Sequence, residues 1–435
     1  MSRFLFDDES YKNNYINAIE RLSKDPFLQN TENESSLLFE FDNIEELKNA
    51  KVINWDDDPK IEKWQDVIQK EESTTILCQL FKSDWGYYSN NDEGIEVPNH
   101  EIIDFFELVE NSRVIDNLEL IHPNLYLQRV SLTGNDIAWF ESCLLDLQLK
   151  ESTVKIRLNK DHSFLFSYKL LKAKHPEPLS YDSFIEISGS ELDLEECRMI
   201  CSTFIFELNC FSGLSLIPSP NFPNVNDEEF DEYVEAKRGL LSEFALLNRS
   251  FKVCNDTVKA IELYNRAISC EDNEISILYF SKVIEYVSET VVRMKVTEVG
   301  RKALSSNRSL MPDANFIKEL QQLFKSHSYK KDSESMELTI QTCCYISDLI
   351  EIIPKFIKNK FENNRKQSDQ AALQFLAKCI SATRNNIAHA KANYVNTGYE
   401  VPEEHYDGFA QLMRLVSQQC IKWYSAQSPS MRIVS

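Results

Sequence analysis

Glycine is scarce in this chain, which has nine glycines in 435 residues; after Gly239 only Gly300, Gly398 and Gly408 remain. Loops that cradle phosphates need closely spaced glycines, because the backbone itself must approach the ligand. No Walker or Rossmann pattern occurs anywhere in the sequence. The common Gly-rich nucleotide-binding motifs are therefore excluded.

Long hydrophobic runs are also missing. The longest, such as ISILYF at 275–280, fall far below the roughly 18 residues that a membrane-spanning helix requires. The first residues, MSRFLFDDES, lack the apolar core of a secretion signal. We expect a cytoplasmic protein that makes no membrane contact.

The eleven cysteines form no CxxC pair. Cys197 and Cys201 lie four residues apart and Cys343 and Cys344 are adjacent, in each case without a histidine nearby. No cluster of Asp, Glu and His has metal-ligand spacing either. We expect buried free thiols in a reducing cytosol, no bound metal and no cofactor.

Negative charge dominates the chain, at −22, but it is unevenly distributed. Residues 1–225 hold 20 Lys and Arg against 41 Asp and Glu, which gives −21; residues 226–435 hold 27 against 28, which gives −1. Within the second half, residues 355–395 carry eight basic side chains and two acidic ones. The first half should repel nucleic acid, whereas the second half need not.

The first half has patterns of both helix and strand. We predict short helices at 61–70 and 101–110, and a β-hairpin at 153–171, where apolar and polar residues alternate around an Asn-Lys-Asp turn. Residues 183–214 read as strand, turn and helix, with Ser190 as the helix N-cap. This half is predicted to be a mixed α/β domain.

Three prolines, Pro218, Pro220 and Pro223, interrupt regular structure at the end of this half. We place the domain boundary near 216–230, so that the domains are 1–225 and 226–435. The second domain should be all-α, which makes the whole chain α+β. Its predicted helices are 232–248, 256–270, 274–296, 312–326, 336–361 with a kink at Pro354, 368–394 and 403–425.

The helix at 368–394 contains an unusual polar group, RNNIAH at 384–389. Ser368 is a good N-cap, and Asp369 suits the first turn. One apolar seam is predicted along this helix at Leu373, Leu376, Ile380, Thr383, Ile387, Ala390 and Tyr394. At about 100° per residue, His389 lies roughly 160° from Ile387 and about 40° from Asn385. We therefore expect His389 on the surface, away from the core of its own bundle.

An arginine five residues before a histidine is not a specific pattern by itself. A second copy, Arg157 and His162, lies across the predicted hairpin turn in the acidic half. Leucine follows Arg157, whereas a polar residue follows Arg384. We interpret the first copy as a chance match and the second as the candidate site.

With these residues, the second half, over about 235–425, resembles the HEPN superfamily. The motif of that superfamily is an arginine, usually followed by a polar residue, and then a histidine, on a late helix of an α-bundle; here it corresponds to Arg384 and His389. The helix at 275–293 resembles the long first helix of HEPN domains, and the acid that this helix often carries corresponds to Glu285. Among the branches of this superfamily, the second half looks most similar in general sequence character to the ApeA-like branch of bacterial abortive-infection proteins.

This resemblance implies a metal-independent endoribonuclease whose site forms across a homodimer. The residue types suit that chemistry: histidine can transfer protons at neutral pH, and an arginine fork can stabilise charge on a phosphoryl group. Asn385 could orient the histidine or the phosphate. The candidate catalytic residues are Arg384, His389, Asn385 and Glu285, and the candidate RNA-binding residues are Lys378, Lys391 and Asn386.

The partners implied are tRNA or mRNA, a second copy of the chain, and a phage trigger or regulatory protein acting on the acidic domain. Such a protein would be a toxin-like effector in antiviral defence. Two other functions stay open. The helical half could be a non-catalytic dimerisation or binding module, or the acidic half could be an adaptor or nucleic-acid mimic.

Overall fold

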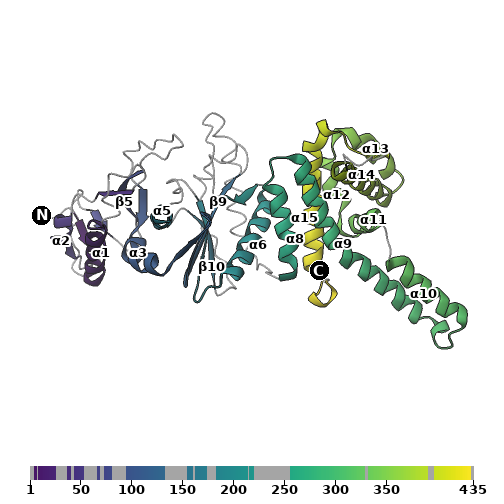
Figure 1. Ribbon diagram of the computed structural model, residues 1–435, viewed down its shortest axis with the longest axis horizontal. Helices are drawn as coiled ribbons and strands as arrows, with labels where there is room; N and C mark the ends of the chain where they lie inside the picture. Colours follow the sequence, from purple (N-terminus) through teal and green to yellow (C-terminus); the bar gives the residue numbers. More distant parts are fainter. Residues whose placement is uncertain are drawn as a thin grey trace. The chain divides into compact units, whose positions relative to one another are not determined.

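A computed structural model describes residues 4–6, 8–25, 37–40, 44–52, 66–68, 73–80, 95–132, 154–159, 162–173, 183–213, 215–219, 255–328, 332–389 and 396–432 (Figure 1). The chain divides into two compact units, Met1–Arg198 with Leu216–Ser250, and Met199–Ser215 with Phe251–Ser435. The first unit mixes helices and strands and the second is helical where it is described. The predicted α+β class is confirmed.

The largest sheet of the first unit is antiparallel, with the strand order β10-β11-β9-β8-β7 and β12 also paired with β9. Its strands are β7 (Arg113–Ile115), β8 (Glu119–His122), β9 (Leu125–Leu132), β10 (Lys155–Asn159), β11 (Ser183–Ser188) and β12 (Leu216–Pro218). Ile156 faces Ile187 and Leu158 faces Ile185 across β10 and β11, and all four side chains are buried.

Smaller sheets accompany it. One has the parallel order β3-β1-β4 and another the antiparallel order β2-β5-β6. The strands concerned are β1 (Phe4–Phe6), β2 (Leu37–Glu40), β3 (Lys51–Val52), β4 (Asp66–Ile68), β5 (Ser73–Leu80) and β6 (Ile95–Pro98). The helix predicted at 61–70 is wrong over Asp66–Ile68, because Val67 pairs with Leu5 in β4. The β-branched Val67 and Ile68 suit that strand.

The helices of this unit are α1 (Glu9–Leu22), α2 (Ile44–Lys48), α3 (Asn99–Asn111) and α5 (Ser163–Lys172). The predicted helix at 101–110 is confirmed by α3. Aromatic side chains join α3 to α5, since the Phe105 ring lies 4.9 Å from that of Phe164 and 5.1 Å from that of Tyr168. These rings are fully buried and form part of the core of the first unit.

The second half of the predicted hairpin at 153–171 is wrong, because α5 follows β10. The cause is a buried carboxylate from α3: Glu101 accepts hydrogen bonds from the backbone N–H groups of His162, at 2.8 Å, and Leu165, at 3.2 Å. These are donors at the open N-terminal end of α5, and an acid there also suits the helix dipole. His162 has a φ of 66°, which turns the chain into the helix.

The predicted N-cap Ser190 is also wrong. The helix α6 (Leu194–Ser212) begins later, and the Asp193 carboxylate accepts the backbone N–H of Glu196 at 3.1 Å. Asp193 is therefore the residue that caps α6, and Ser190 lies in the preceding turn. The predicted order of strand, turn and helix is confirmed.

The helical unit contains α8 (Asn255–Ile268), α9 (Asn273–Leu304), α10 (Ala314–Ser328), α11 (Asp332–Cys343), α12 (Ile346–Leu349), α13 (Lys355–Arg365), α14 (Asp369–His389) and α15 (Tyr406–Ala426). Short 3-10 turns lie at Asn307–Ser309, Ile350–Ile352, Glu403–His405 and Pro429–Met431. The helix predicted at 232–248 lies outside the described residues. Helices were correctly predicted at α8, α9, α10, α14 and α15, although α9 continues to Leu304.

The single helix predicted at 336–361 is wrong, because the chain leaves the helical conformation twice. After α11, Tyr345 is extended and its N–H donates to the Gln419 side chain at 3.0 Å. Farther on, Pro354 forces the preceding Ile353 into an extended conformation and occupies the N-cap position of α13. Pro354 therefore separates two helices and does not kink one.

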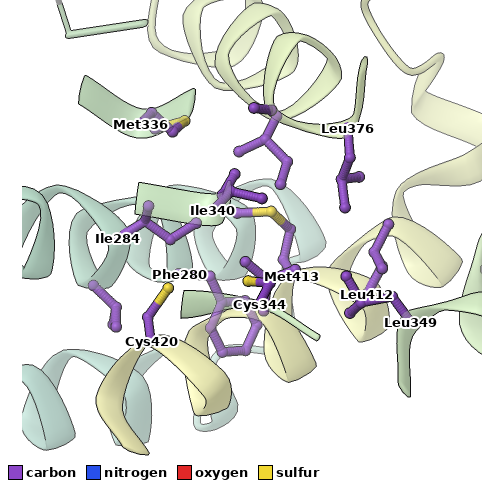
Figure 2. Packing of buried hydrophobic residues seen from close by; sticks show 14 of the residues in the cluster. Phe280, Ile284, Met336, Ile340, Cys344, Leu349, Leu376, Leu412, Met413 and Cys420 are labelled. Carbon is purple, nitrogen blue, oxygen red and sulfur yellow. The ribbon is translucent and has the colours of Figure 1, made fainter. Parts of the chain in front are cut away.

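The core of this unit forms around α9, which packs against α8, α11, α14 and α15. Figure 2 shows side chains from α9, α11, α12, α14 and α15 in one cluster, and the residues labelled there are Phe280, Ile284, Met336, Ile340, Cys344, Leu349, Leu376, Leu412, Met413 and Cys420. The cysteines of the described part are free. Burial raises the pKa of the Cys379 thiol to about 12, so this thiol stays protonated at neutral pH.

The C-terminal part of α6 belongs to the helical unit, so the units differ from the expected ranges 1–225 and 226–435. The Phe206 ring lies 5.1 Å from that of Tyr264, and the Asn265 side chain donates to the Ser202 carbonyl at 3.1 Å. Arg414 on α15 donates to the Tyr264 hydroxyl at 3.2 Å and to the Ser215 hydroxyl at 3.1 Å. Apolar burial and polar contacts thus both hold the C-terminal part of α6 against α8 and α15.

Across the described ranges, every helix is too short or too polar to span a membrane.

Replacing Glu101 with glutamine should loosen the start of α5. An amide has one acceptor oxygen where the carboxylate has two, so a buried N–H loses its partner, at a cost of about 1–3 kcal/mol. Hydrogen exchange in a peptide covering 162–173 should then become roughly tenfold faster or more. The control is Glu110→Gln at an exposed position of the same helix, which should leave exchange unchanged. Equal exchange in Glu101→Gln and the parent would contradict the capping role.

Candidate functional site

An ion pair joins the two helices that carry the candidate residues. The Arg384 guanidinium on α14 lies 2.8 Å from the Glu285 carboxylate on α9, measured from Nη2 to Oε1. The side chains are 26% and 34% exposed, so the pair lies at the edge of the core and can still be reached from solvent. The arginine and the acid predicted for one site are therefore adjacent, although 99 positions separate them.

Asn385 completes this group. Its side-chain oxygen accepts a hydrogen bond from Arg384 Nη1 at 2.9 Å. The terminal nitrogens of the guanidinium thus have different partners: Nη1 donates to Asn385, whereas the contact of Nη2 with Glu285 is an ion pair outside hydrogen-bond geometry. An arginine has five N–H donors, and the bond to Asn385 uses one of them. Donors remain that could bind a phosphoryl oxygen.

Local features of α14 hold Arg384 in this position. The Ser368 hydroxyl accepts the backbone N–H of Ala371 at 3.0 Å, which confirms the predicted N-cap. The predicted seam is confirmed at the buried Leu373, Leu376, Ile380 and Thr383, and Ile387 packs against the same core. Its last members, Ala390 and Tyr394, lie outside the described residues.

The segment that follows α14 returns to the helix beside the site. The hydroxyl of the fully buried Thr383 accepts the backbone N–H of Val401 at 3.0 Å. Val401 is itself almost completely buried. The residue directly before Arg384 is thus fixed by a contact that leaves Arg384 itself free to turn toward α9.

Asn386 is directed toward another helix. It forms a side-chain hydrogen bond with Tyr406, at the start of α15. Burial raises the pKa of the Tyr406 phenol, and the bond from Asn386 offsets part of this effect. Since Asn386 lies about 200° from Arg384 around the helix, these two residues serve different contacts.

The remaining predicted residues are distributed along α14 and beyond it. Lys378 is exposed and lies six residues, or about 9 Å, before Arg384 along the helix axis. His389 is the last residue of α14, and its side chain lies outside the described residues, as does Lys391. The residues brought together are therefore Glu285, Arg384 and Asn385, with Asn386 and Lys378 apart from them.

The second Arg-x4-His copy falls in two different elements of the first unit. Arg157 is on β10, and His162 lies just before α5. His162 is buried, with Nδ1 at 3.5 Å from the Glu186 carboxylate, next to the capping Glu101. This buried polar group was not predicted, because its members come from a helix, a turn and a strand, and no sequence spacing links them.

Comparison with protein-family models, with curated proteins and with solved structures finds no match for this chain. Over the part of the chain that the structure describes, no group of three or more His, Cys, Asp and Glu side chains is arranged to hold a metal ion.

A double-mutant cycle on Glu285→Gln and Arg384→Gln should give a coupling energy of about 0.5–1 kcal/mol, because the pair is partly shielded from water. The measurement is the unfolding of the helical unit in denaturant, followed by circular dichroism. The matched control is Glu362 and Arg365, a pair within α13 at 3.5 Å with similar exposure. Its coupling should stay below about 0.5 kcal/mol. A coupling near zero for Glu285 and Arg384 would show that the pair is not formed in solution.

Proposed function

We propose that the helical unit is a metal-independent endoribonuclease of the HEPN type, acting in the cytoplasm as a toxin-like effector of antiviral defence. The observation that supports this most is the 2.8 Å contact between Arg384 and Glu285. The resemblance to this superfamily implies an arginine on a late helix and often an acid on the long first helix, and this contact brings the two corresponding residues together. The charge distribution agrees with RNA as a substrate, because the helical half carries little of the net negative charge.

The proposed reaction uses the RNA's own 2′-hydroxyl. His389 removes the proton of this hydroxyl, and the oxygen forms a new bond to phosphorus while the bond to the 5′-oxygen breaks. A second histidine protonates the departing 5′-oxygen, and the products are a 2′,3′-cyclic phosphate and a 5′-hydroxyl. Arg384 stabilises the charge that grows on the phosphoryl oxygens, and Asn385 orients the guanidinium.

Two histidines are needed for this chemistry, and each chain supplies one. In the proposed dimer, α14 of one copy faces α14 of the other, so two His389 side chains and two Arg384 side chains share one site. Glu285 then acts as a positioning residue, because it contacts Arg384 and does not need to touch the RNA. The acidic domain would serve as a sensor or restraint, responding to a phage trigger or a regulatory protein.

A second candidate function is a non-catalytic binding module. The observation that favours it is the same ion pair, since Glu285 already neutralises the charge of Arg384. In that reading the pair joins α9 to α14, and the helical unit dimerises or binds RNA without cutting it. The two functions differ in one measurable product, because only the nuclease releases RNA with 2′,3′-cyclic phosphate ends.

The test is cleavage of a tRNA or mRNA pool by the purified full chain. The parent should release 2′,3′-cyclic phosphate ends and be insensitive to a chelator. His389→Ala and Arg384→Ala should each reduce the rate by at least about a hundredfold, which is the scale of a lost acid–base group or charge-stabilising donor. Arg365→Ala removes an arginine from the same basic region and should keep full activity.

Full activity of His389→Ala or Arg384→Ala would reject the catalytic roles. Absence of cleavage by the parent, with RNA binding retained, would establish the binding module instead. Glu285→Gln should lower the rate less than Arg384→Ala does, because it removes the group that orients the arginine and not the arginine itself. An equal loss in both variants would mean that the carboxylate takes part directly.

A further inference from the structure

A cavity of about 450 Å³ lies between α13, α14 and the segment 396–402 of the helical unit. Small-ligand sites commonly have volumes of about 300–1,000 Å³. The side chains that matter for its chemistry are Lys360, Asn363, Gln374, Phe375, Lys378 and Tyr399. With Asn364, which also lines the cavity, two lysines, three amides and two aromatic rings therefore border a space that is large enough for one nucleotide.

The cavity is positively charged. No acidic side chain lines it, and within the described residues neither Lys360 nor Lys378 forms an ion pair with a carboxylate. Two carboxylates bind to the wall of the cavity without lining it: Glu337 accepts a hydrogen bond from Gln374 at 2.9 Å, and Glu400 accepts the N–H groups of residues 397 and 398. Two uncompensated lysines facing one cavity, in a chain of net charge −22, favour an anionic ligand.

One wall of the cavity offers an aromatic face. The ring of Tyr399 is 37% exposed, its centroid lies 6.0 Å from that of Phe375, and the Lys378 ammonium is 5.9 Å from it. The turn before this tyrosine is held by Glu400 and by Gly398, which has a φ of 82°. A base can stack on such a ring, because every nucleobase has a π face.

We infer that this cavity binds one nucleotide of an RNA strand, with its phosphate between Lys360 and Lys378 and its base against Tyr399. Lys378 and Asn385 are seven residues apart on one face of α14, which corresponds to about 10 Å. A stacked strand covers that distance in about three nucleotides. The lining of the cavity supports a nucleotide by itself, while the assignment to the RNA strand rests on the proposed nuclease function.

The experiment measures binding separately from cleavage. The full chain carrying His389→Ala is titrated with adenosine monophosphate, with inorganic phosphate and with a 2′-O-methylated RNA oligonucleotide that cannot be cut through its 2′-oxygen. Adenosine monophosphate should bind saturably, and at least tenfold more tightly than phosphate, because stacking adds to the charge contacts.

Variants of the lining then test the site. Lys360→Ala, Lys378→Ala and Tyr399→Ala should each weaken mononucleotide and oligonucleotide binding about tenfold. Tyr399→Phe keeps the ring and should bind like the parent. Lys358→Ala removes an exposed lysine of α13 outside the cavity and is the charge-matched control. Circular dichroism of each variant checks that the helices are intact.

The outcomes separate the two proposals. Unchanged mononucleotide binding in both lysine variants overturns the cavity as a nucleotide site. Mononucleotide binding that is lost while oligonucleotide binding is unaffected overturns the assignment to the RNA strand and indicates a free nucleotide. If both are weakened but the parent cuts no RNA, the inferred site stands and the nuclease function falls.

Discussion

The burial of α9 on several sides is the constraint on which the helical unit depends. Five helices (α8, α10, α11, α14 and α15) pack against it, so its sequence has no single apolar stripe. Some of its buried hydroxyls are satisfied within the helix itself. The Ser281 hydroxyl donates to the Ile277 carbonyl at 2.9 Å, and the Ser288 hydroxyl donates to the Glu285 carbonyl at 2.6 Å. These bonds allow hydroxyls inside a dry core without an unpaired donor. A charged residue on α9 is tolerated only where the packing opens, and Glu285 lies at such an opening.

This constraint explains why Glu285 and Arg384 meet. The carboxylate is partly shielded from water, so a cation beside it is favourable. Arg384 reaches it from α14, whose direction is fixed by the apolar seam and by the bond between Thr383 and Val401. The ion pair is therefore a product of the packing of two helices, and its contribution to stability is modest compared with the apolar core beneath it.

Local signals in the sequence predicted the helices that carry their own caps and apolar faces. Ser368 and the seam of α14 are of this kind. The predictions failed where a distant residue decides the local structure: Glu101 converts an alternating segment into α5, Gln419 holds the break after α11, and Leu5 draws Val67 into a strand. No spacing within those segments contains that information.

The same distinction applies to the candidate site. Arg384 and Asn385 are neighbours in sequence, so a local motif is enough to identify them as candidates. Their partner Glu285 is predicted only through the resemblance of its helix to the long first helix of HEPN domains. The cavity around Lys360 and Tyr399 could not be predicted, because three segments build it. Of the candidate RNA-binding residues predicted from the sequence, only Lys378 lines this cavity.

If the proposed function is correct, the cations near α14 have two different roles, catalysis and RNA binding. Glu285 lowers the net charge around Arg384, so that arginine contributes orientation and transition-state stabilisation more than attraction to RNA. Affinity must come from cations without a carboxylate partner, and Lys360 and Lys378 are of that kind. Binding beside the middle of α14 and chemistry toward its C-terminal end would let an acidic protein hold RNA through a few contacts while most of its surface repels it. Such binding should weaken only shallowly with salt, because the slope of log affinity against log salt is about −0.7 per neutralised phosphate of a single strand, and salt also screens the repulsion from the acidic surface.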